Sequence, residues 1–409
     1  MTIIAQDGVN RITPESVSGE MHPTIAGSSK KLAAISLFSG AGGMDVGFRN
    51  AGFETVLAND IDPLACESFR MNHGDVIVEG DVRALFPLAS RLQGIDLIFG
   101  GPPCQGFSVA GKMDPFDGRN QLIENFLQLV GLIRPRAFVC ENVKALAALT
   151  RWRAVRNRLL SESSRLGYES ALLVLDASHF GVPQARERMF LIGFRRDTLR
   201  AADRIHAALK ILLADLEVRP PTIQDVIRSL GRAGDDTNSR ICRAKITFAK
   251  APILRRSPYA GMLFNGAGRP LAARGLSSTL PASMGGNKTP IVDEAEIFDG
   301  AESFVESYHA YLMQGGKPRD GDAPKNLRRL TMDECLAIQT FPSNYRFAGS
   351  QSAIFRQIGN AVPCKLGEVV AKTVNLILNS DIPDFILAML DSARVDRQQF
   401  LLGKPSQYA

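Results

Sequence analysis

The sequence lacks the patterns of several common protein classes. Its six cysteines and five histidines are scattered, with no Cys-x-x-Cys pair and no His-Glu-x-x-His motif, so we expect neither a zinc site nor metal catalysis. The cysteines also lack the spacing of a disulfide framework, which favours a reducing cytoplasm as the compartment. No apolar run reaches the roughly 18 residues that span a bilayer, so we expect no membrane contact.

The first thirty residues lack the basic start and the apolar core of a secretory signal. They are polar, and we expect residues 1–31 to form a mobile tail. The whole chain has 409 residues, of which 45% are hydrophobic and 22% charged. This size suits two domains, or one large domain with an insertion.

Charge is distributed unevenly along the chain. The net charge of the whole chain is +6. Between residues 228 and 274, ten Lys and Arg residues stand against two acids, which leaves +8 in this window alone. Such an excess fits a phosphate backbone as partner, although a solvated loop face would have the same composition. The adjacent pair Arg255 and Arg256 is our candidate for contact with nucleic acid.

Short apolar runs alternate with segments of helical periodicity from residue 32 onward. The apolar runs predict strands at 32–38, 54–59, 76–80, 95–100, 137–142, 170–178 and 188–194. The segments between them predict helices at 43–51, 62–72, 120–134 and 152–166. This alternation is typical of a layered α/β fold with a mostly parallel sheet, in which ligands bind beyond the carboxyl ends of the strands.

The pattern changes after about residue 205. Residues 215–325 are richer in Gly, Pro, Ser and Arg and lose the alternation, which indicates a smaller, irregular second domain. Helical periodicity returns at 331–341 and 358–379. We therefore expect a first domain over 32–205, a second domain over 206–325, a return to the first domain over 326–380 and a C-terminal extension over 381–409.

A glycine-rich turn follows the first predicted strand, in LFSGAGGMDVGF. Gly40, Gly42 and Gly43 permit a tight turn, and the helix that follows offers free N–H groups. Asp60 closes the second predicted strand, and Asp81 follows the third. A glycine turn with acids at successive strand ends suits an adenosine-containing cofactor, although the acids could instead cap helices.

One cysteine, Cys104, lies in GGPPCQGFS directly after the fourth predicted strand. A thiolate at this edge of a parallel sheet could act as a nucleophile. Pro102 and Pro103 stiffen the approach to it, and the glycines that follow could let the loop close as a lid. A lone cysteine is more often a small buried residue, but this position favours the nucleophile.

Two further motifs at strand ends carry charged groups. Glu141 in CENV closes an apolar strand, where partial desolvation would favour its protonated form and suit a proton donor. In QARERMF, Arg186 and Arg188 alternate and so share one face of a starting strand. They could clamp a phosphate or an acidic partner.

Together, these motifs resemble those of the DNA cytosine-5 methyltransferases. The resemblance covers residues 33–200 and 326–378, and six motifs occur in the family's order: FSGAGG, GGPPCQGFS, ENV, QARERMF, RRLTMDECLAIQTFP and QIGNAVP. It implies a Rossmann-like domain that binds S-adenosyl-L-methionine, with a target-recognition domain at the basic segment. It further implies methylation of C5 of a specific cytosine in double-stranded DNA, as in bacterial restriction–modification systems that protect host DNA beside a separate endonuclease.

The resemblance implies a covalent mechanism in which the target base is flipped into a pocket. Cys104 would attack C6 of the ring, and Glu141 would donate a hydrogen bond or a proton at N3. Arg188 would hold the base and the Cys104 side, and Arg186 would support a phosphate. C5 would take the methyl group from S-adenosyl-L-methionine, and loss of the C5 proton would release Cys104.

The same resemblance implies contacts with the cofactor and with DNA. The cofactor residues would be Phe38, Ser39, Gly40, Ala41, Gly42, Gly43, Asp60, Ile61, Asp81, Val82 and Asn360. The DNA residues would be Gln105, Phe107, Ser108, Arg255 and Arg256. Asp60 would hold the ribose, Ile61 an adenine face and Asp81 the adenine amine. We expect a monomer, held at the nucleoid by its DNA.

Three other functions remain open from the sequence. RNA cytosine-5 methylation would use the same machinery, but the long basic segment favours DNA. Methylation of an exocyclic amine typically uses a loop of the form Asp/Asn/Ser-Pro-Pro-aromatic, where this chain reads GPPC. A catalytically inactive DNA-binding relative would not need Cys104, Glu141 and Arg188, and all three are present.

Overall fold

The computed structural model describes residues 31–103, 121–198 and 205–379. The tail expected over 1–31 lies outside these residues except for its last position, and the extension expected over 381–409 lies wholly outside them. Cys104 and its neighbours Gln105, Phe107 and Ser108 also lie outside the described residues.

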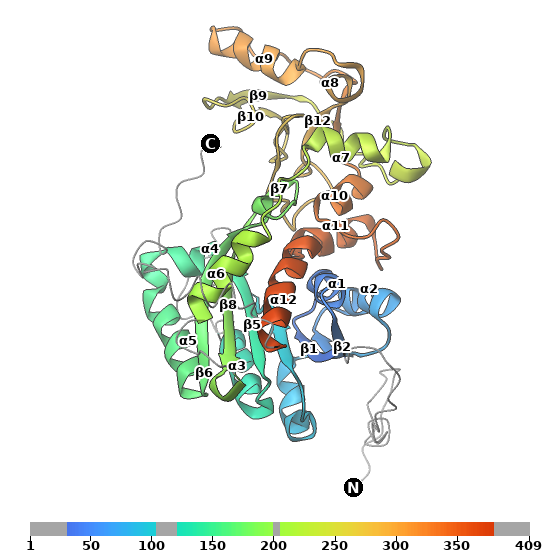
Figure 1. Ribbon diagram of the computed structural model, residues 1–409. Helices are drawn as coiled ribbons and strands as arrows, with labels where there is room; N and C mark the ends of the chain where they lie inside the picture. Colours follow the sequence, from blue (N-terminus) through green and yellow to red (C-terminus); the bar gives the residue numbers. More distant parts are fainter. Residues whose placement is uncertain (1–30, 104–120, 199–204, 380–409) are drawn as a thin grey trace. The chain divides into compact units, whose positions relative to one another are not determined.

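Seven strands form a central sheet in the order β3-β2-β1-β4-β5-β8-β6. Figure 1 labels β2, β1, β5, β8 and β6 of this sheet. The strands are β1 (Leu32–Leu37), β2 (Phe53–Asp60), β3 (Ile77–Glu79), β4 (Leu97–Gly100), β5 (Ala137–Val143), β6 (Tyr168–Asp176) and β8 (Glu187–Arg195). β8 runs antiparallel to both of its neighbours, and the other neighbouring pairs run parallel. The expected mostly parallel sheet is therefore confirmed.

Helices cover both faces of this sheet. One face carries α1 (Gly43–Asn50), α6 (Ile205–Asp215) and α12 (Cys364–Leu378), and Figure 1 shows α12 beside α1. The other face carries the 3-10 helix η2 (Val82–Arg91), α3 (Gln121–Ile133), α4 (Lys144–Ala148) and α5 (Arg153–Arg165). α2 (Pro63–His73) packs beside β2 and β3. This arrangement leaves the carboxyl ends of β1 to β5 along one edge, where ligands bind in such folds.

Two of these helices follow from simple features of the sequence. α3 buries apolar residues at the spacing of one helix face, namely Ile123, Phe126, Leu127, Val130 and Ile133. The helical periodicity over 358–379 is divided in the structure between α11 (Gln351–Asn360) and α12. The break falls at Pro363, which has no N–H to continue the earlier helix.

Shorter elements build the segment 206–325 and its neighbours. They are α7 (Ile223–Leu230), β9 (Phe248–Ile253), β10 (Met262–Phe264), β12 (Ile291–Asp293), α8 (Glu294–Asp299), α9 (Phe304–Met313), α10 (Met332–Ile338), and the pair β7 (Gln184–Ala185) and β11 (Ser277–Ser278). Phe248 of β9 packs edge-on against Tyr308 of α9, with ring centroids 5.0 Å apart. These rings belong to a hydrophobic cluster separate from the two on the central sheet.

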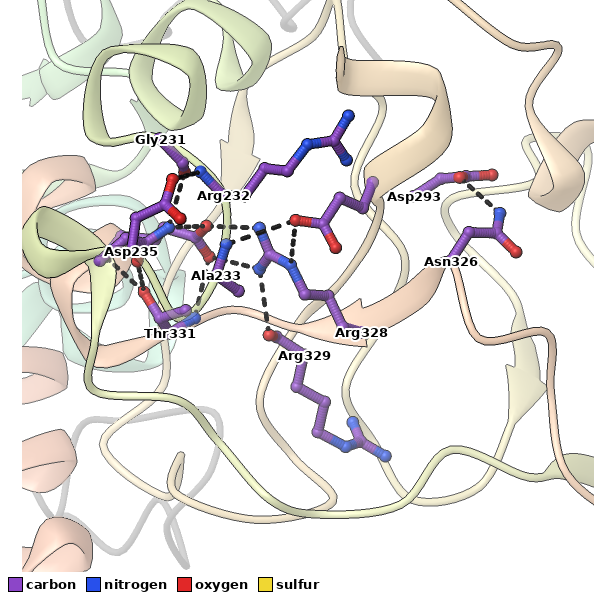
Figure 2. Close-up of polar contacts among 12 residues, drawn as sticks. Gly231, Arg232, Ala233, Asp235, Asp293, Asn326, Arg328, Arg329 and Thr331 are labelled. Atoms are coloured by element: carbon purple, nitrogen blue, oxygen red, sulfur yellow. Dashed lines mark hydrogen bonds and ion pairs between the residues drawn. The ribbon is translucent and has the colours of Figure 1, made fainter. Parts of the chain in front are cut away.

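A buried ion cluster joins the segment 206–325 to the segment after it. Arg328 of β13 (Leu327–Arg329), which is labelled in Figure 2, donates to Glu334 at 2.7 Å and lies 3.4 Å from Glu294 of α8. Glu334 is 0% exposed and also accepts a hydrogen bond from Asn238 at 3.0 Å. Because a buried charge without its partner is costly, this cluster fixes how the two segments join.

Two classes of feature are absent from the described part of the chain. No helix there combines the length and the apolar character that a membrane span requires. The same residues also contain no group of three His, Cys, Asp or Glu side chains that could hold a metal ion.

Candidate active site

The glycine-rich turn lies at the carboxyl end of β1, between the ends of β2 and β4. Phe38, Gly40 and Gly42 have φ angles of 53°, 56° and 86°, in the left-handed region. Gly42 can adopt such an angle without strain because it has no Cβ. The Gly40 N–H donates to Asp60 Oδ2 at 2.7 Å, so the turn is tied to the acid that ends β2.

Three groups beside this turn have the chemistry that an adenosine requires. Burial raises the pKa of Asp60, although the N–H groups of Asp62 and Gly40 stabilise its charged form. Ile61 is 69% exposed, which is unusual for a large apolar side chain and leaves a face for an aromatic ring. Asp81 supplies a second carboxylate, and the hydrogen bond from Arg83 lowers its pKa. The two carboxylates, which accept hydrogen bonds, and the exposed apolar face of Ile61 therefore fit an adenosine group.

The Asp81 carboxylate is already bonded at both oxygens. Arg83 donates from Nε to Oδ1 at 2.9 Å and from its terminal nitrogen to Oδ2 at 2.8 Å. The Arg83 side chain is 66% exposed, so it can turn into solvent when another donor approaches the carboxylate. Val82, the next residue, is 2% exposed and packs in the core. Its side chain therefore exposes almost no surface, and its contact with the cofactor stays a prediction.

The segment after α11 lies directly against the glycine-rich turn. A Cβ atom placed on Gly43 would be 3.0 Å from Ala361 Cβ and 3.0 Å from the Val362 carbonyl oxygen. Asn360, the last residue of α11, is exposed and immediately precedes these two. The return of the chain therefore brings the region of Asn360 to the turn, as the sequence motifs implied.

Glu141 and Arg188 form an ion pair at the neighbouring strand ends. β5 and β8 pair in the register that sets Glu141 opposite Phe190 and Val143 opposite Arg188. Arg188 Nε lies 2.9 Å from Glu141 Oε1, and the side chains are 16% and 12% exposed. Burial raises the pKa of Glu141, and the positive charge of Arg188 opposes that rise. The direction of the shift is the one expected for a proton donor.

The residues that lead into Cys104 lie against this ion pair. A Cβ atom on Gly101 would stand 2.8 Å from Glu141 Oε2, so a side chain at this position would require the carboxyl to move. The side-chain amide of Asn142 donates to the Pro102 carbonyl at 3.2 Å. Asn142 is 2% exposed and was not among the predicted site residues. Its position directly after Glu141 was the only sequence signal for it.

Arg186 does not have the surroundings expected of a phosphate contact. Its side chain is 2% exposed, and its guanidinium donates to the carbonyl oxygens of Leu280 at 3.3 Å and Gly359 at 3.1 Å. It also precedes β8 instead of lying within it. Since main-chain carbonyls surround the guanidinium, Arg186 joins the start of β8 to the segment 206–325 and to α11.

The basic segment is partly neutralised by acids outside it. Arg232 pairs with Asp299, and Arg240 pairs with Asp333. The value of +8 from the sequence therefore overstates the free positive charge of this surface. Arg255 and Arg256 are both exposed, and the Arg255 carbonyl oxygen lies 2.8 Å from His309 Nε2.

The chain matches one family over most of its length. The model of the C-5 cytosine-specific DNA methylases matches residues 32–375. The Type II methyltransferase M.NgoFVII of Neisseria gonorrhoeae is 33% identical over 353 residues, which are 85% of this chain and 87% of that protein. The Type II methyltransferase M.FnuDI of Fusobacterium nucleatum is 30% identical over 84% of this chain and 94% of its own length.

Solved structures share the fold at lower sequence identity. The Dnmt2 methyltransferase of S. pombe has a TM-score of 0.58 at 18% identity, over 86% of this chain and all of that chain. The DNMT2 mutant of Spodoptera frugiperda has a TM-score of 0.56 at 19% identity, over 84% of this chain and 99% of that chain. At these identities the likeness establishes the fold.

Proposed function

Because this chain belongs to the C-5 cytosine-specific DNA methylases, we propose that it methylates one cytosine of a specific duplex sequence at the edge formed by β1, β4, β5 and β8. Its methyl donor is S-adenosyl-L-methionine. The observation that carries the proposal is the buried pair of Glu141 and Arg188. This pair lies against Gly101, three residues before Cys104.

Each catalytic side chain has one task in this mechanism. The target base is flipped out of the duplex, and the Cys104 thiolate adds to C6. Burial raises the pKa of Glu141, and Glu141 donates a hydrogen bond or a proton at N3, which offsets the charge that develops on the ring. When bound, S-adenosyl-L-methionine supplies an electrophilic methyl group for C5. Loss of the C5 proton to solvent then re-forms the double bond between C5 and C6, breaks the bond between C6 and sulfur and frees Cys104, and a proton given to N3 returns to Glu141.

Arg188 and Asn142 hold this machinery in place. Arg188 fixes the orientation of Glu141 through the 2.9 Å contact and stabilises the carboxylate left after proton donation. Asn142 holds the Pro102 carbonyl, and this restrains the backbone that enters Cys104. Catalytic groups must be held close to the productive geometry, and both contacts serve that purpose.

The covalent step can be tested with one substitution and one trap. We expect Cys104→Ser to abolish methyl transfer while S-adenosyl-L-methionine still binds with nearly unchanged affinity by calorimetry. We also expect a duplex with 5-fluorocytosine at the target to form a covalent complex only when the cofactor is present, because the C5 fluorine cannot leave as a proton does. Full activity of Cys104→Ser, or no shifted band on a denaturing gel, would contradict the mechanism.

Contact with DNA is proposed for the exposed pair Arg255 and Arg256. Replacing both with Ala should weaken duplex binding and reduce the slope of log K against log salt by about 2, roughly one unit per lost phosphate contact. The matched control replaces Arg91 and Arg153, which are exposed on other segments. An unchanged slope in the Arg255/Arg256 variant would move the DNA contact elsewhere.

The proposal extends to the biological setting. We infer that the chain acts as a monomer at the nucleoid and protects host DNA from a separate restriction endonuclease. Bisulfite sequencing of DNA from cells that express the protein would give the methylated cytosine and its sequence context. Methylation confined to RNA would contradict the DNA substrate.

A further inference from the structure

Two side chains from distant segments hold the glycine-rich turn from one side. The Tyr345 hydroxyl donates to the Ala41 carbonyl oxygen, and it lies 2.8 Å from His73 Nε2. Tyr345 lies after α10, while His73 is the last residue of α2. Both are near Gly42: a Cβ atom there would stand 2.5 Å from His73 Nε2 and 2.8 Å from the Tyr345 oxygen.

The direction of these hydrogen bonds follows from the number of protons available. A tyrosine hydroxyl has a single proton, and here it goes to Ala41, whose carbonyl can only accept. The Tyr345 oxygen is therefore free to accept from His73 in the tautomer that carries its proton on Nε2. Burial lowers the pKa of His73 to about 4, although a hydrogen bond with the Gly42 backbone opposes this shift, so the ring is neutral at neutral pH.

The surrounding packing leaves the two rings little freedom. The Tyr345 ring lies 4.8 Å from that of Phe341, and the His73 ring lies 4.6 Å from that of Phe69. Tyr345 is 5% exposed. The hydrogen bond from this donor restrains the rotation of the Ala41 carbonyl and of the peptide planes next to it. Gly42, with its left-handed φ of 86°, directly follows Ala41 in the chain.

We propose that His73 and Tyr345 form a hydrogen-bonded relay that positions the turn at 38–43 for S-adenosyl-L-methionine. They are positioning residues, because they act through the Ala41 carbonyl and not by contact with the cofactor. The relay makes cofactor affinity depend on the segment 341–362, which also supplies Asn360. This inference rests on the proposed assignment of the turn as the cofactor site.

The first test removes the hydroxyl and keeps the ring. Tyr345→Phe should raise the Kd for S-adenosyl-L-methionine about 3- to 10-fold, the usual effect of one lost hydrogen bond. The KM for the cofactor should rise with it, while kcat at saturating cofactor and the KM for DNA stay near their wild-type values. An unchanged Kd for the cofactor would overturn the proposal.

Tyr168→Phe is the matched control for this substitution. Tyr168 is 1% exposed, and its hydroxyl also donates to a main-chain carbonyl, that of Pro135, at 2.7 Å. It is the first residue of β6 and lies at the amino ends of the parallel strands, whereas the cofactor turn lies at their carboxyl ends. We expect a similar loss of stability from Tyr168→Phe with no change in cofactor Kd. Equal loss of affinity in both variants would reduce Tyr345 to a general stabilising contact and overturn the proposal.

The second test is a double-mutant cycle with His73→Phe, which keeps an aromatic ring but removes the donor. If the relay exists, His73→Phe weakens cofactor binding in the wild type and has little further effect in Tyr345→Phe. Strictly additive losses would contradict a relay. His73→Phe also serves if Tyr345→Phe does not fold, since it leaves the bond to Ala41 in place.

Asp60→Ala distinguishes a failure of the relay from a failure of the proposed cofactor site. If Asp60→Ala weakens cofactor binding and Tyr345→Phe does not, only the relay is wrong. If Asp60→Ala leaves the Kd unchanged, the proposed cofactor site is itself wrong. Weakening in both variants, with Tyr168→Phe unaffected, is the result we expect.

Discussion

Asp45 provides a quantitative test of how burial acts beneath the cofactor turn. It lies in the first turn of α1 and is 0% exposed. Its carboxyl accepts hydrogen bonds from the Ser36 hydroxyl at 3.0 Å and the Thr55 hydroxyl at 3.1 Å. Desolvation raises its pKa from 3.8 to about 7, although both hydroxyls favour the charged form. The folded chain therefore keeps this proton where the unfolded chain has lost it.

The sign of the pH effect follows from proton uptake. Between pH 4 and pH 7 the folded state holds more protons at Asp45 than the unfolded state does, so stability falls as pH rises through this range. With pKa values of 3.8 and about 7, the contribution of Asp45 to the free energy of unfolding falls by about 2 kcal/mol between pH 5.5 and pH 8. Below pH 4 its contribution is fully present.

Asp45→Asn removes this titration with little change of shape. The amide oxygen can accept from one hydroxyl while the amide nitrogen donates to the other, because hydroxyl groups rotate. We expect urea unfolding to give similar stabilities for variant and wild type at pH 5.5. At pH 8 the variant should be more stable by about 2 kcal/mol. Parallel pH profiles would refute the raised pKa, and so would a variant less stable at pH 8.

Two further substitutions test the catalytic edge and the junction between segments. Gly101→Ala should place a Cβ 2.8 Å from Glu141 Oε2. Because this displaces the carboxyl, we expect kcat to fall about 10- to 100-fold, while the Kd for the cofactor stays unchanged. A normal kcat would show that the carboxyl is free to move. Arg328→Met should leave the buried Glu334 without its partner and destabilise the protein by about 3–5 kcal/mol in urea unfolding. Adding Glu334→Gln should restore part of the loss, and no recovery would contradict the electrostatic origin.

Much of the sheet could be predicted because each strand carries its own apolar run. The parallel strands are buried on both faces. Each can therefore be recognised in the sequence as a continuous apolar run, without knowledge of which strands lie beside it. The same logic located Asp60, Asp81, Glu141 and the approach to Cys104, since all follow the ends of such strands. The positions of these residues could be predicted because they follow from the order of the strands, while their roles in the site stay a prediction.

The contacts that could not be predicted from the sequence join residues that are far apart in the chain. The alternation in QARERMF indicated an anion clamp, but the carbonyls of Leu280 and Gly359 enclose Arg186. No local pattern reveals that two remote main-chain oxygens will lie there. The bond between Tyr345 and Ala41 joins residues 304 positions apart, and the partners of Asn142 and His73 are likewise set only by the tertiary fold.

The long separation between the glycine-rich turn and Tyr345 has a consequence for synthesis on the ribosome. The turn leaves the ribosome 304 residues before its supporting tyrosine, a delay of about 15 to 60 s at usual rates of translation. During this time β1, β2 and β4 can pair, but the hydrogen bond from Tyr345 to the Ala41 carbonyl cannot yet form. We therefore expect nascent chains to bind the methyl donor poorly, which makes cofactor capture one of the last events in the maturation of the enzyme.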